Sequence, residues 1–465
     1  MKTPPIGRRH FLGGAAALTA AGLAGRAVAQ TTRNPPPRAQ TFSRQWQQIA
    51  ARDYPPGEPG RDYTPVTVPN GQTLPHRVVD GVKVFHLTAS EFTHHFAPGL
   101  QATCWGYNGL VNATTLEAVE GDTVRVYLTN RLPVPTTVHW HGFILPQGMD
   151  GVSGLEQPPI PVGETWVYQW KIVQHGTFMF HSHHDTMTQE GMGLTGMFIV
   201  HPRKAESDPD GDRDDQTTRE AIPAVDRDFA LMLHEWRIDA GASKPDVNEM
   251  SDFNILTING KVMPHTDPLV CGLNQRVRIR LANLSAMDHH PIHLHGHEFY
   301  ETAVDGFRIP EAQQLRKVTV MMGVGQTRDI EFVADNPGDW PIHCHMTHHV
   351  MNQMGHDFPN MIGVDTQGFD QAARRLVPGY MTMGQNGMYD MGTEDGMQMP
   401  MPDNSIPMQK GPGPYGPIGL GGMATVVKIR DGLTSYDDPG WYRQPEGTAV
   451  RQATDNELKR DGVQL

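Results

Sequence analysis

The sequence predicts an all-β protein that contains two similar β-sandwich domains. Three observations support this prediction. The 465 residues include 49 Gly and 38 Pro, which is typical of short strands joined by many turns. Between these turns, apolar and polar residues alternate with a period of two. One pattern of strands and histidines also occurs twice, which favours two copies of an antiparallel sandwich over alternating strands and helices.

The internal repeat has two parts. Residues 118–143 and 270–299 each contain an alternating apolar strand, a run of the form Val-Arg-Val/Ile-x-Leu-x-Asn, and then His-x-His-Gly. Residues 164–185 and 327–349 correspond in the same way, because each places a glycine-bearing turn before a His-x-His sequence. The strand pattern and the histidines therefore repeat together, which indicates a duplicated unit.

The N-terminal residues 1–29 have the features of an export signal. Arg8 and Arg9 precede a stretch rich in Gly and Ala, which ends at Ala27-Val28-Ala29. Paired arginines, a weakly apolar centre and an Ala-x-Ala site predict a twin-arginine signal peptide. The apolar stretch is too short and too rich in glycine for a stable membrane span. We therefore expect a periplasmic or exported protein without stable membrane insertion.

The rest of the chain divides by composition. A Met-rich insertion at 370–420, with eight methionines in 381–408, is expected before a last strand at 421–429. The predicted parts are a Pro-rich extension at 30–77, a first sandwich at 78–203, an acidic linker at 204–226, a second sandwich at 227–432 and a polar tail at 433–465.

Composition also limits the classes of function. The formal net charge of -13 argues against a nucleic-acid partner, because phosphate binding requires a basic surface. The 24 His and 25 Met favour a soft or borderline metal such as copper or zinc. Three cysteines cannot form a disulfide scaffold. Cys104 and Cys271 are expected to be buried thiols, although the sequence leaves a disulfide between them open.

Four His-x-His sequences carry most of the expected chemistry. Successive side chains of a strand point to opposite faces, so both histidines of each pair share one face. Four such pairs at matched places predict a surface between the two domains that holds several copper or zinc ions. The eight histidines are His139, His141, His181, His183, His293, His295, His343 and His345.

Cys344 points to the opposite face from its two neighbouring histidines. Two imidazoles, one thiolate and a weak axial thioether are the ligands of a blue, electron-transfer copper. The candidates for this set are His290, Cys344, His349 and Met354. In the first repeat, Thr136, Ser182, Met187 and Met192 occupy the corresponding positions. We therefore expect a blue copper in the second sandwich only.

These motifs resemble those of the multicopper oxidases, in particular the laccase and copper-resistance oxidase group. The matching sequences are HWHG at 139–142, HSH at 181–183, HPIHLHGH at 290–297 and HCHMTHHVMNQM at 343–354. The resemblance implies cupredoxin-like Greek-key sandwiches and four copper ions per functional site. By this pattern, the type 1 copper takes His290, Cys344, His349 and Met354. The type 2 copper takes His139 and His293, and the type 3 pair takes His141, His181, His183, His295, His343 and His345.

The chain resembles a two-domain subclass of this family. Members usually have three domains, but the stretch between His183 and His290 is too short for another sandwich. In the two-domain subclass, the trinuclear site forms between the first domain of one subunit and the second domain of the next. The resemblance therefore implies a homotrimer.

The expected function is that of a copper-dependent oxidoreductase. It would couple four one-electron oxidations of Cu(I), phenolic compounds or both to the reduction of O₂ to water. The bonds that join Cys344 to His343 and His345 offer a short route for electrons. Protons are expected to pass through carboxylates, with Asp150 and Glu298 as candidates. Asp150 precedes a glycine, so a structural role in a turn is the other interpretation.

The Met-rich segment 381–408 follows the type 1 ligands in sequence, and thioethers select Cu(I). This suggests Cu(I) as electron donor, whereas a flexible, gap-filling loop is the other interpretation. The remaining histidines near the motifs are expected to support the ligands or to lie on the surface. They are His184, His289, His297 and His348.

Two other functions remain open. A copper-containing nitrite reductase also has two sandwiches, but it carries its blue copper in the first domain and needs only three interface histidines. Ser182 and the full set of eight histidines argue against it. A non-enzymatic periplasmic protein that binds copper is the second alternative. Oxygen consumption would distinguish an oxidase from both.

Overall fold

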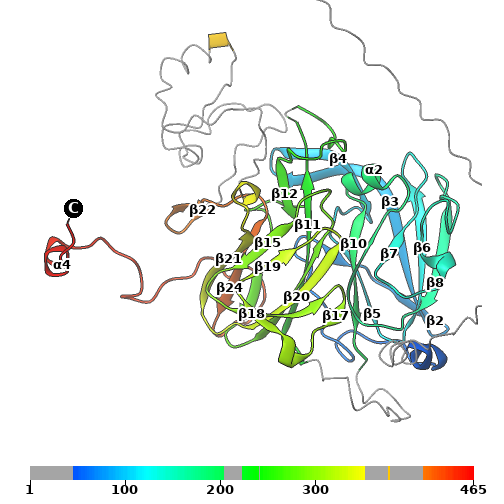
Figure 1. Ribbon diagram of the computed structural model, residues 1–465, viewed down its shortest axis with the longest axis horizontal. Helices are drawn as coiled ribbons and strands as arrows, with labels where there is room; N and C mark the ends of the chain where they lie inside the picture. The colour runs from blue at the N-terminus through cyan, green and yellow to red at the C-terminus, as the bar shows by residue number, and fades with distance from the viewer. Residues whose placement is uncertain (1–45, 204–222, 240, 351–374, 377–411, 465) are drawn as a thin grey trace, which may run out of the picture. The chain divides into compact units, whose positions relative to one another are not determined.

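The computed structural model describes residues 46–203, 223–239, 241–350, 375–376 and 412–464. This part of the chain is nearly all-β and forms two sandwiches (Figure 1). The predicted signal peptide at 1–29, the Met-rich segment at 381–408 and Met354 lie outside the described residues.

The first sandwich contains two sheets whose inner faces share one apolar core. The alternating burial of β6 (Thr123–Arg131) shows how the period-two pattern works, because Val124, Val126 and Leu128 point inward. One sheet has the order β1 (Gln72–Thr73), β5 (Thr114–Val119), β10 (Thr195–His201), β9 (Gly176–His181), β7 (His139–His141). The other has the order β2 (Arg77–Val79), β3 (Val82–Ala97), β6 (Thr123–Arg131), β8 (Thr165–Lys171), with β4 (Leu100–Tyr107) on β3.

The second sandwich repeats this plan around its own core. One sheet has the order β12 (Ile255–Ile258), β11 (Arg227–Trp236), β14 (Arg276–Asn283), β20 (Gln326–Val333), β16 (Phe299–Val304), β17 (Phe307–Arg308), with β18 (Leu315–Lys317) on β16. The other has the order β13 (Leu269–Gly272), β24 (Ala424–Arg430), β21 (Gly338–Cys344), β15 (His290–Leu294), β19 (Thr319–Met322). The strand expected at 421–429 is β24.

The strand pairings confirm the internal repeat. In the first sandwich β6 lies between β3 and β8, and in the second β14 lies between β11 and β20, with the same directions. Likewise β9 pairs with β7 and β10, as β21 pairs with β15 and β24. The sandwiches are not purely antiparallel as expected, because β3–β6 and β11–β14 are parallel. Alternation in a sequence does not distinguish the two directions.

Short elements and irregular segments complete the described chain. They include a helical segment at 46–51, η1 (Gln147–Met149), α2 (Thr186–Gly191), η3 (Glu311–Gln313), η4 (Thr347–Val350), β22 (Pro412–Gly413), β23 (Gly416–Pro417) and α4 (Asp455–Arg460). Residues 52–71 are largely irregular and contact both sandwiches, because Val66 N–H donates to Glu117 and Thr67 N–H donates to the carbonyl of Asp228. None of the helices in the described part has the length and apolar character required to cross a bilayer.

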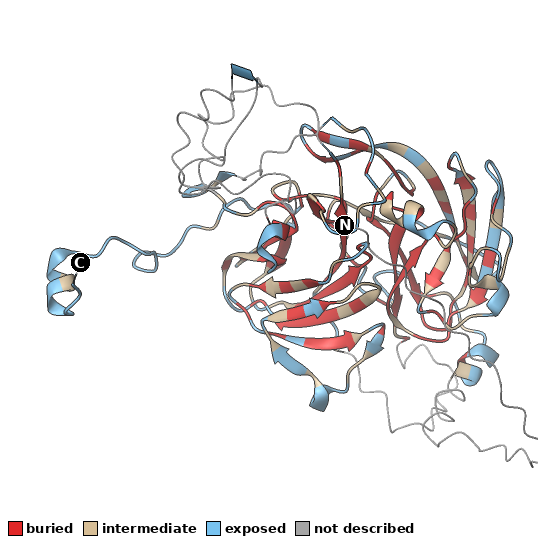
Figure 2. Ribbon diagram, turned by 45° about the horizontal axis from the view of Figure 1, so that its top comes forward, coloured by how far each residue is buried: buried red, intermediate tan, exposed pale blue. Residues whose placement is uncertain are grey.

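A buried ionic network joins the two sandwiches. The guanidinium of Arg280 on β14 makes two bonds of 2.8 Å to Asp228 on β11 and lies 3.3 Å from Asp329 on β20. It also donates to the hydroxyl of Thr177, which lies on β9 of the first sandwich and donates to Asp329 at 2.6 Å. All four residues are buried. Figure 2 shows that buried residues lie along the strands of both sandwiches.

Candidate metal centres

A compact cluster of two imidazoles and one thiol lies inside the second sandwich. The Nδ1 atoms of His290 and His349 are 3.1 Å apart, and Sγ of Cys344 lies 3.8 Å and 3.4 Å from them. His290 begins β15, Cys344 ends the neighbouring β21, and His349 lies in η4. All three side chains are fully buried. The structure thus brings together three of the four residues expected at a type 1 site, and the fourth, Met354, is outside the described residues.

Polar neighbours orient both imidazoles of this cluster. Nε2 of His290 is 2.7 Å from the hydroxyl of Ser285, and Nε2 of His349 is 3.5 Å from a carboxylate oxygen of Asp288. Both Nδ1 atoms are thereby directed at the thiol. Sequence reasoning missed Ser285 and Asp288, although both lie within five residues of His290 in the sequence.

Glu235 fixes the loop that carries Asp288. Its carboxylate accepts bonds from the N–H groups of Met287 and Asp288 at 2.6 and 3.0 Å. Burial, and then the charge of Asp288, raise the pKa of Glu235 to about 8. Contact with His349 lowers the pKa of Asp288. At neutral pH the pair therefore holds a proton on Glu235 and a negative charge on Asp288, beside a metal-site histidine.

Burial determines the protonation of the cluster itself. It raises the pKa of the Cys344 thiol to about 12, and it lowers the pKa of His290 to about 3, with His349 as the next cause. The thiol of Cys344 and the imidazole of His290 are therefore neutral in the metal-free protein. A metal cation would bind through the imidazole nitrogens and displace the thiol proton. Two nitrogens and one sulfur in a dry, preformed site fit copper.

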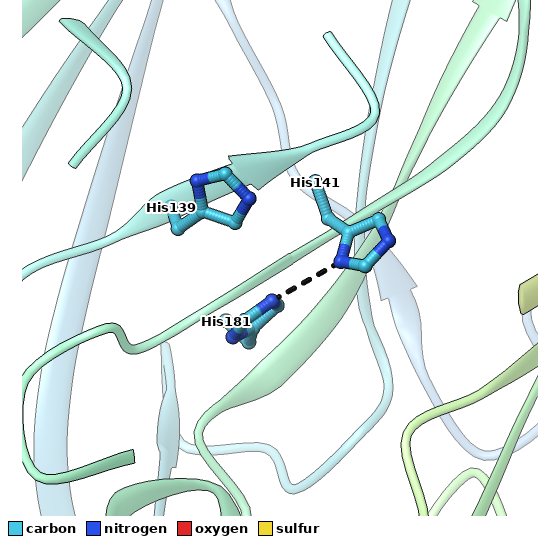
Figure 3. Close-up of side chains that lie close together, drawn as sticks. All are labelled: His139, His141 and His181. Carbon is cyan, nitrogen blue, oxygen red and sulfur yellow. Dashed lines mark hydrogen bonds between the residues drawn. The ribbon is translucent and has the colours of Figure 1, made fainter. Parts of the chain in front are cut away.

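The first histidine quartet lies at one end of the first sandwich. His139 and His141 are on β7, His181 ends β9, and His183 follows two residues later. The register pairs His139 with His181 directly across the two strands. Ring centroids of the pairs in contact within the quartet are 5.3–6.0 Å apart. Nδ1 of His141 approaches Nε2 of His181 to 3.3 Å, so these two atoms can share one metal ion (Figure 3).

The second histidine quartet has the same construction in the second sandwich. His293 on β15 pairs in register with His343 on β21, and His295 and His345 follow on the same strand ends. Nε2 of His295 and Nε2 of His343 are 3.1 Å apart. Nδ1 of His293 donates to the carbonyl of Val318, and Nδ1 of His343 donates to that of Cys344. The Nε2 atoms of these two rings are therefore the ones free to bind a metal ion.

The eight histidines do not meet within one chain. Among the described residues, every ring contact between two of the eight joins members of the same quartet. The expected surface with eight imidazoles is thus present as two separate halves. The second half opens onto a pocket of about 1030 Å³, which is lined in part by His293, His295, Tyr300 and Val318.

The two candidate proton carriers occupy different environments. Asp150 adjoins the first quartet, because Nδ1 of His139 lies 2.8 Å from its carbonyl oxygen and 3.3 Å from its carboxylate. Glu298 lines the pocket beside the second quartet. Its side chain is 56% exposed and pairs with Arg316 at 3.1 Å.

The other histidines have contacts of their own. His184 bonds the hydroxyl of Ser153, and Nδ1 of His289 accepts the N–H of Val324. His297 packs its ring against aromatic side chains of the second core, and His348 is exposed in η4. Cys104 and Cys271 are buried free thiols, so the disulfide left open by the sequence is not formed.

The first sandwich has no thiolate at the position that corresponds to Cys344. Ser182 occupies it, and Thr136 occupies the position of His290. Oε1 of Gln189 accepts bonds from both hydroxyls, at 2.5 and 2.6 Å, and all three side chains are fully buried. A hydrogen-bonded group thus fills the space that holds the thiol cluster in the second sandwich.

Comparison with known proteins assigns the family. Multicopper oxidase domain profiles match residues 88–205 and 239–363, which together are just over half of the chain. The chain belongs to the multicopper oxidase family. The first match covers most of the first sandwich and the second match the central part of the second, and together they include both quartets and the thiol cluster. Copper is the metal that this family implies, and the donor atoms described above fit it.

Similar proteins cover parts of this multicopper oxidase. Copper resistance protein A of Pseudomonas syringae pv. tomato is 41% identical over 108 residues, which are 23% of this chain and 17% of that protein. Copper resistance protein A of Escherichia coli is 37% identical over 129 residues, which are 28% and 18% of the two chains. The matched segments are thus less than a fifth of the length of these two relatives.

Solved structures match a larger share of this chain than these two relatives do. A multicopper oxidase named mgLAC gives a TM-score of 0.53 at 25% identity and covers 77% of this chain and 89% of its own. The blue copper oxidase from Nitrosomonas europaea gives a TM-score of 0.51 at 24% identity, and the match covers 74% of this chain and 85% of that protein. The second likeness shows the fold alone.

Proposed function

We propose that this multicopper oxidase couples four one-electron oxidations of a reducing substrate to the reduction of O₂ to water. The observation that carries the proposal is the position of Cys344. Its side chain belongs to the buried cluster with His290 and His349, while its chain neighbours His343 and His345 belong to the second quartet. A site that accepts electrons and a site that binds several metal ions are therefore joined by a few covalent bonds.

The proposed copper sites follow the donor atoms. His290, Cys344, His349 and Met354 would hold the type 1 copper, and His139 and His293 the type 2 copper. The type 3 pair would take the other six histidines, which are His141, His181, His183, His295, His343 and His345. Each quartet supports metal binding, because two of its donor atoms approach closely, and in the first quartet the donor atoms of His139, His141 and His181 lie within 4.8 Å of one another. Copper bound there supplies one-electron transfer and the site of O₂ reduction.

The chain's own residues have three roles in this reaction. Ser285 and Asp288 hold the outer nitrogens of the type 1 histidines, so that both Nδ1 atoms face the thiol. Asp150, which adjoins His139, is proposed to hold protons for O₂ reduction. Glu298 is proposed as a second proton carrier, supported by its place in the pocket beside His293 and His295.

We further propose that the complete site forms between subunits. The first quartet of one chain would face the second quartet of the next, which closes a homotrimer. Each quartet is half of a site, and the second one opens onto a pocket. Apolar side chains are exposed around that pocket, including Tyr300 at 45%, Val318 at 51% and Val333 at 49%, and such patches mark interaction surfaces.

Cu(I), phenolic compounds or both are the proposed electron donors. Met287 and Met346 are 54% and 40% exposed and lie close in sequence to the type 1 ligands. Thioethers bind Cu(I) in preference to harder ions. The Met-rich segment 381–408 would add further thioether donors. Export to the periplasm or beyond through the twin-arginine signal at 1–29 would suit a protein that folds before transport.

The function is tested by copper content, absorption and oxygen uptake. We expect four copper ions per functional site, an intense thiolate-to-copper band, and O₂ consumption with Cu(I) or a phenol. Nitrite reduction without O₂ uptake would instead identify a nitrite reductase. Copper binding with neither activity would leave only a copper-binding protein.

The shared site is tested by complementation. His141→Ala disables the first quartet, and His295→Ala disables the second. Co-expressed, the two variants form mixed trimers in which an intact first quartet faces an intact second quartet at some interfaces. Oxidase activity should therefore reappear in the mixed sample and stay absent from each variant alone. No recovery in mixed trimers would mean that each site is formed by a single chain.

A further inference from the structure

Helix α2 places a carboxylate beside the imidazole ring of His181. The helix begins five residues after this histidine and places Glu190 near its end. Nδ1 of His181 lies 2.8 Å from Oε1 of Glu190 and 2.9 Å from the carbonyl oxygen of Ser182. Both neighbours are acceptors, so Nδ1 must carry the proton. Nε2, on the other side of the ring, faces His141.

The environment of Glu190 leaves its carboxylate few other partners. The side chain is 18% exposed, and Oε1 is buried. Within the described part of the chain, this oxygen accepts no hydrogen bond of regular geometry, and its contact is the 2.8 Å approach of Nδ1 of His181. A buried carboxylate oxygen is costly unless a donor compensates for the lost water. The N–H of His181 is the donor that the structure offers.

The adjacent residue, Gln189, fixes the helix from the inside. Its Nε2 donates to the carbonyl of Pro135 at 2.8 Å, and its Oε1 accepts from Thr136 and Ser182. Gln189 is fully buried in the space that corresponds to the thiol cluster of the second sandwich. Because Gln189 holds α2 against the core, the following residue is held beside the metal-site histidine.

The corresponding histidine of the second sandwich has the same backbone contact but no carboxylate beside it. Nδ1 of His343 donates to the carbonyl of Cys344 at 2.7 Å, as Nδ1 of His181 does to that of Ser182 at 2.9 Å. Among the described residues, no carboxylate lies within ion-pair distance of His343. The carboxylate contact is therefore a feature of the first quartet and not a general consequence of the repeat.

We propose that Glu190 is a positioning residue that holds His181 in the Nδ1–H form, with Nε2 directed at the shared metal site. The inference rests on the proposed function, in which His181 is a type 3 copper ligand. A carboxylate behind a metal-bound imidazole fixes its tautomer and ring orientation and increases its strength as a ligand. Loss of such a partner lowers metal affinity about 10- to 100-fold.

The test compares three variants of the full-length protein. Glu190→Ala removes the acceptor, and Glu190→Gln keeps an uncharged acceptor of the same shape. Met187→Ala is the control, because Met187 lies on the same helix and is 61% exposed. Each metal-free protein is titrated with copper against a competing chelator, and the thiolate-to-copper band reports the type 1 site separately. Nitrogen-15 NMR of the metal-free proteins reports which nitrogen of His181 carries the proton.

We expect Glu190→Ala to lose about 10-fold or more in copper affinity at the type 3 site, with the type 1 band unchanged. The Nδ1–H population of His181 should fall in this variant. Glu190→Gln should lie between it and wild type, and Met187→Ala should match wild type. Full type 3 occupancy together with an unchanged tautomer in Glu190→Ala would overturn the proposal. If Glu190→Ala does not fold, the copper affinity and the His181 tautomer of Glu190→Gln are compared with those of wild type instead, and unchanged values would overturn the proposal.

The tautomer measurement also separates this inference from the proposed function. It needs no copper, so it can succeed or fail independently of oxidase activity. Wild-type protein that binds no copper at the histidines but keeps His181 in the Nδ1–H form would contradict the proposed function and leave the contact with Glu190 intact.

Discussion

Replacing Arg280 with methionine should strongly destabilise the contact between the two sandwiches. The side chain of Arg280 is 3% exposed and lies between Asp228 and Asp329, whose side chains are 2% and 8% exposed. The variant keeps an apolar side chain of similar length but removes the positive charge and the bond to Thr177. Two buried carboxylates then lose their main partner.

The magnitude follows from what each carboxylate retains. Removing one member of a buried ion pair costs about 3–5 kcal/mol, because the other charge is left without compensation. Asp228 keeps Arg278 at 3.4 Å, and Asp329 keeps the hydroxyl of Thr177 at 2.6 Å. We therefore expect the lower end, a loss of about 3 kcal/mol in the free energy of unfolding.

The dependence on pH provides a second signature. In the wild type, burial acts to raise the pKa of Asp228, but Arg280 and Arg278 lower it below its ordinary value. This pairing stabilises the protein above the unfolded pKa of about 4, and the benefit is lost as pH falls through the folded pKa. Without Arg280 burial dominates and raises the pKa of Asp228. The variant then gains stability on protonation, so the gap to wild type should narrow as pH falls from 7 towards 4.

Denaturant unfolding of metal-free protein at several pH values measures both effects. Arg316→Met is the matched control, because Arg316 is 62% exposed and pairs with the exposed Glu298. Exposed pairs contribute about 0–1 kcal/mol, so the control should stay within that range. A loss below about 1 kcal/mol for Arg280→Met, or a gap that does not depend on pH, would refute the reasoning.

Three further predictions concern the copper chemistry. Cys344→Ser should abolish the thiolate-to-copper band and oxidase turnover in absorption and oxygen-electrode measurements; a retained band would exclude this thiol as ligand. Asp150→Asn keeps the carbonyl contact to His139 but removes the carboxylate, so O₂ consumption should fall about 10-fold or more while reduction of the type 1 copper stays fast in stopped-flow absorption. Unchanged O₂ consumption would exclude Asp150 as proton carrier. Deletion of 381–408 should reduce Cu(I) oxidation far more than phenol oxidation, and equal losses would contradict a role in Cu(I) supply.

Much of the fold and of the site could be predicted from local sequence patterns. Alternation defines a buried face on a strand, so the histidines of each His-x-His fall on one side and Cys344 on the other. The repeat then places equivalent motifs in equivalent positions, as the pairs His139–His181 and His293–His343 show. Prediction succeeded where one strand and its direct neighbour determine the geometry.

The features that were missed depend on contacts between distant segments. Glu235 lies on β11, far in sequence from Asp288. It nevertheless fixes the loop that carries Asp288 beside His349. The contact of Glu190 with His181 depends on a single turn of α2, whose direction is determined by buried hydrogen bonds of Gln189. The separation of the two quartets within one chain was expected only from the resemblance to the two-domain subclass, because no motif encodes how the sandwiches pack.

The division of the histidines between the two sandwiches has a consequence for copper loading, provided that the complete site forms between subunits as proposed. A newly folded single chain would then carry only two half-sites, so copper loading and association of subunits would be one linked event. Dilution would lower activity by separating the subunits, and a defective chain would also impair the sites that it shares with its neighbours.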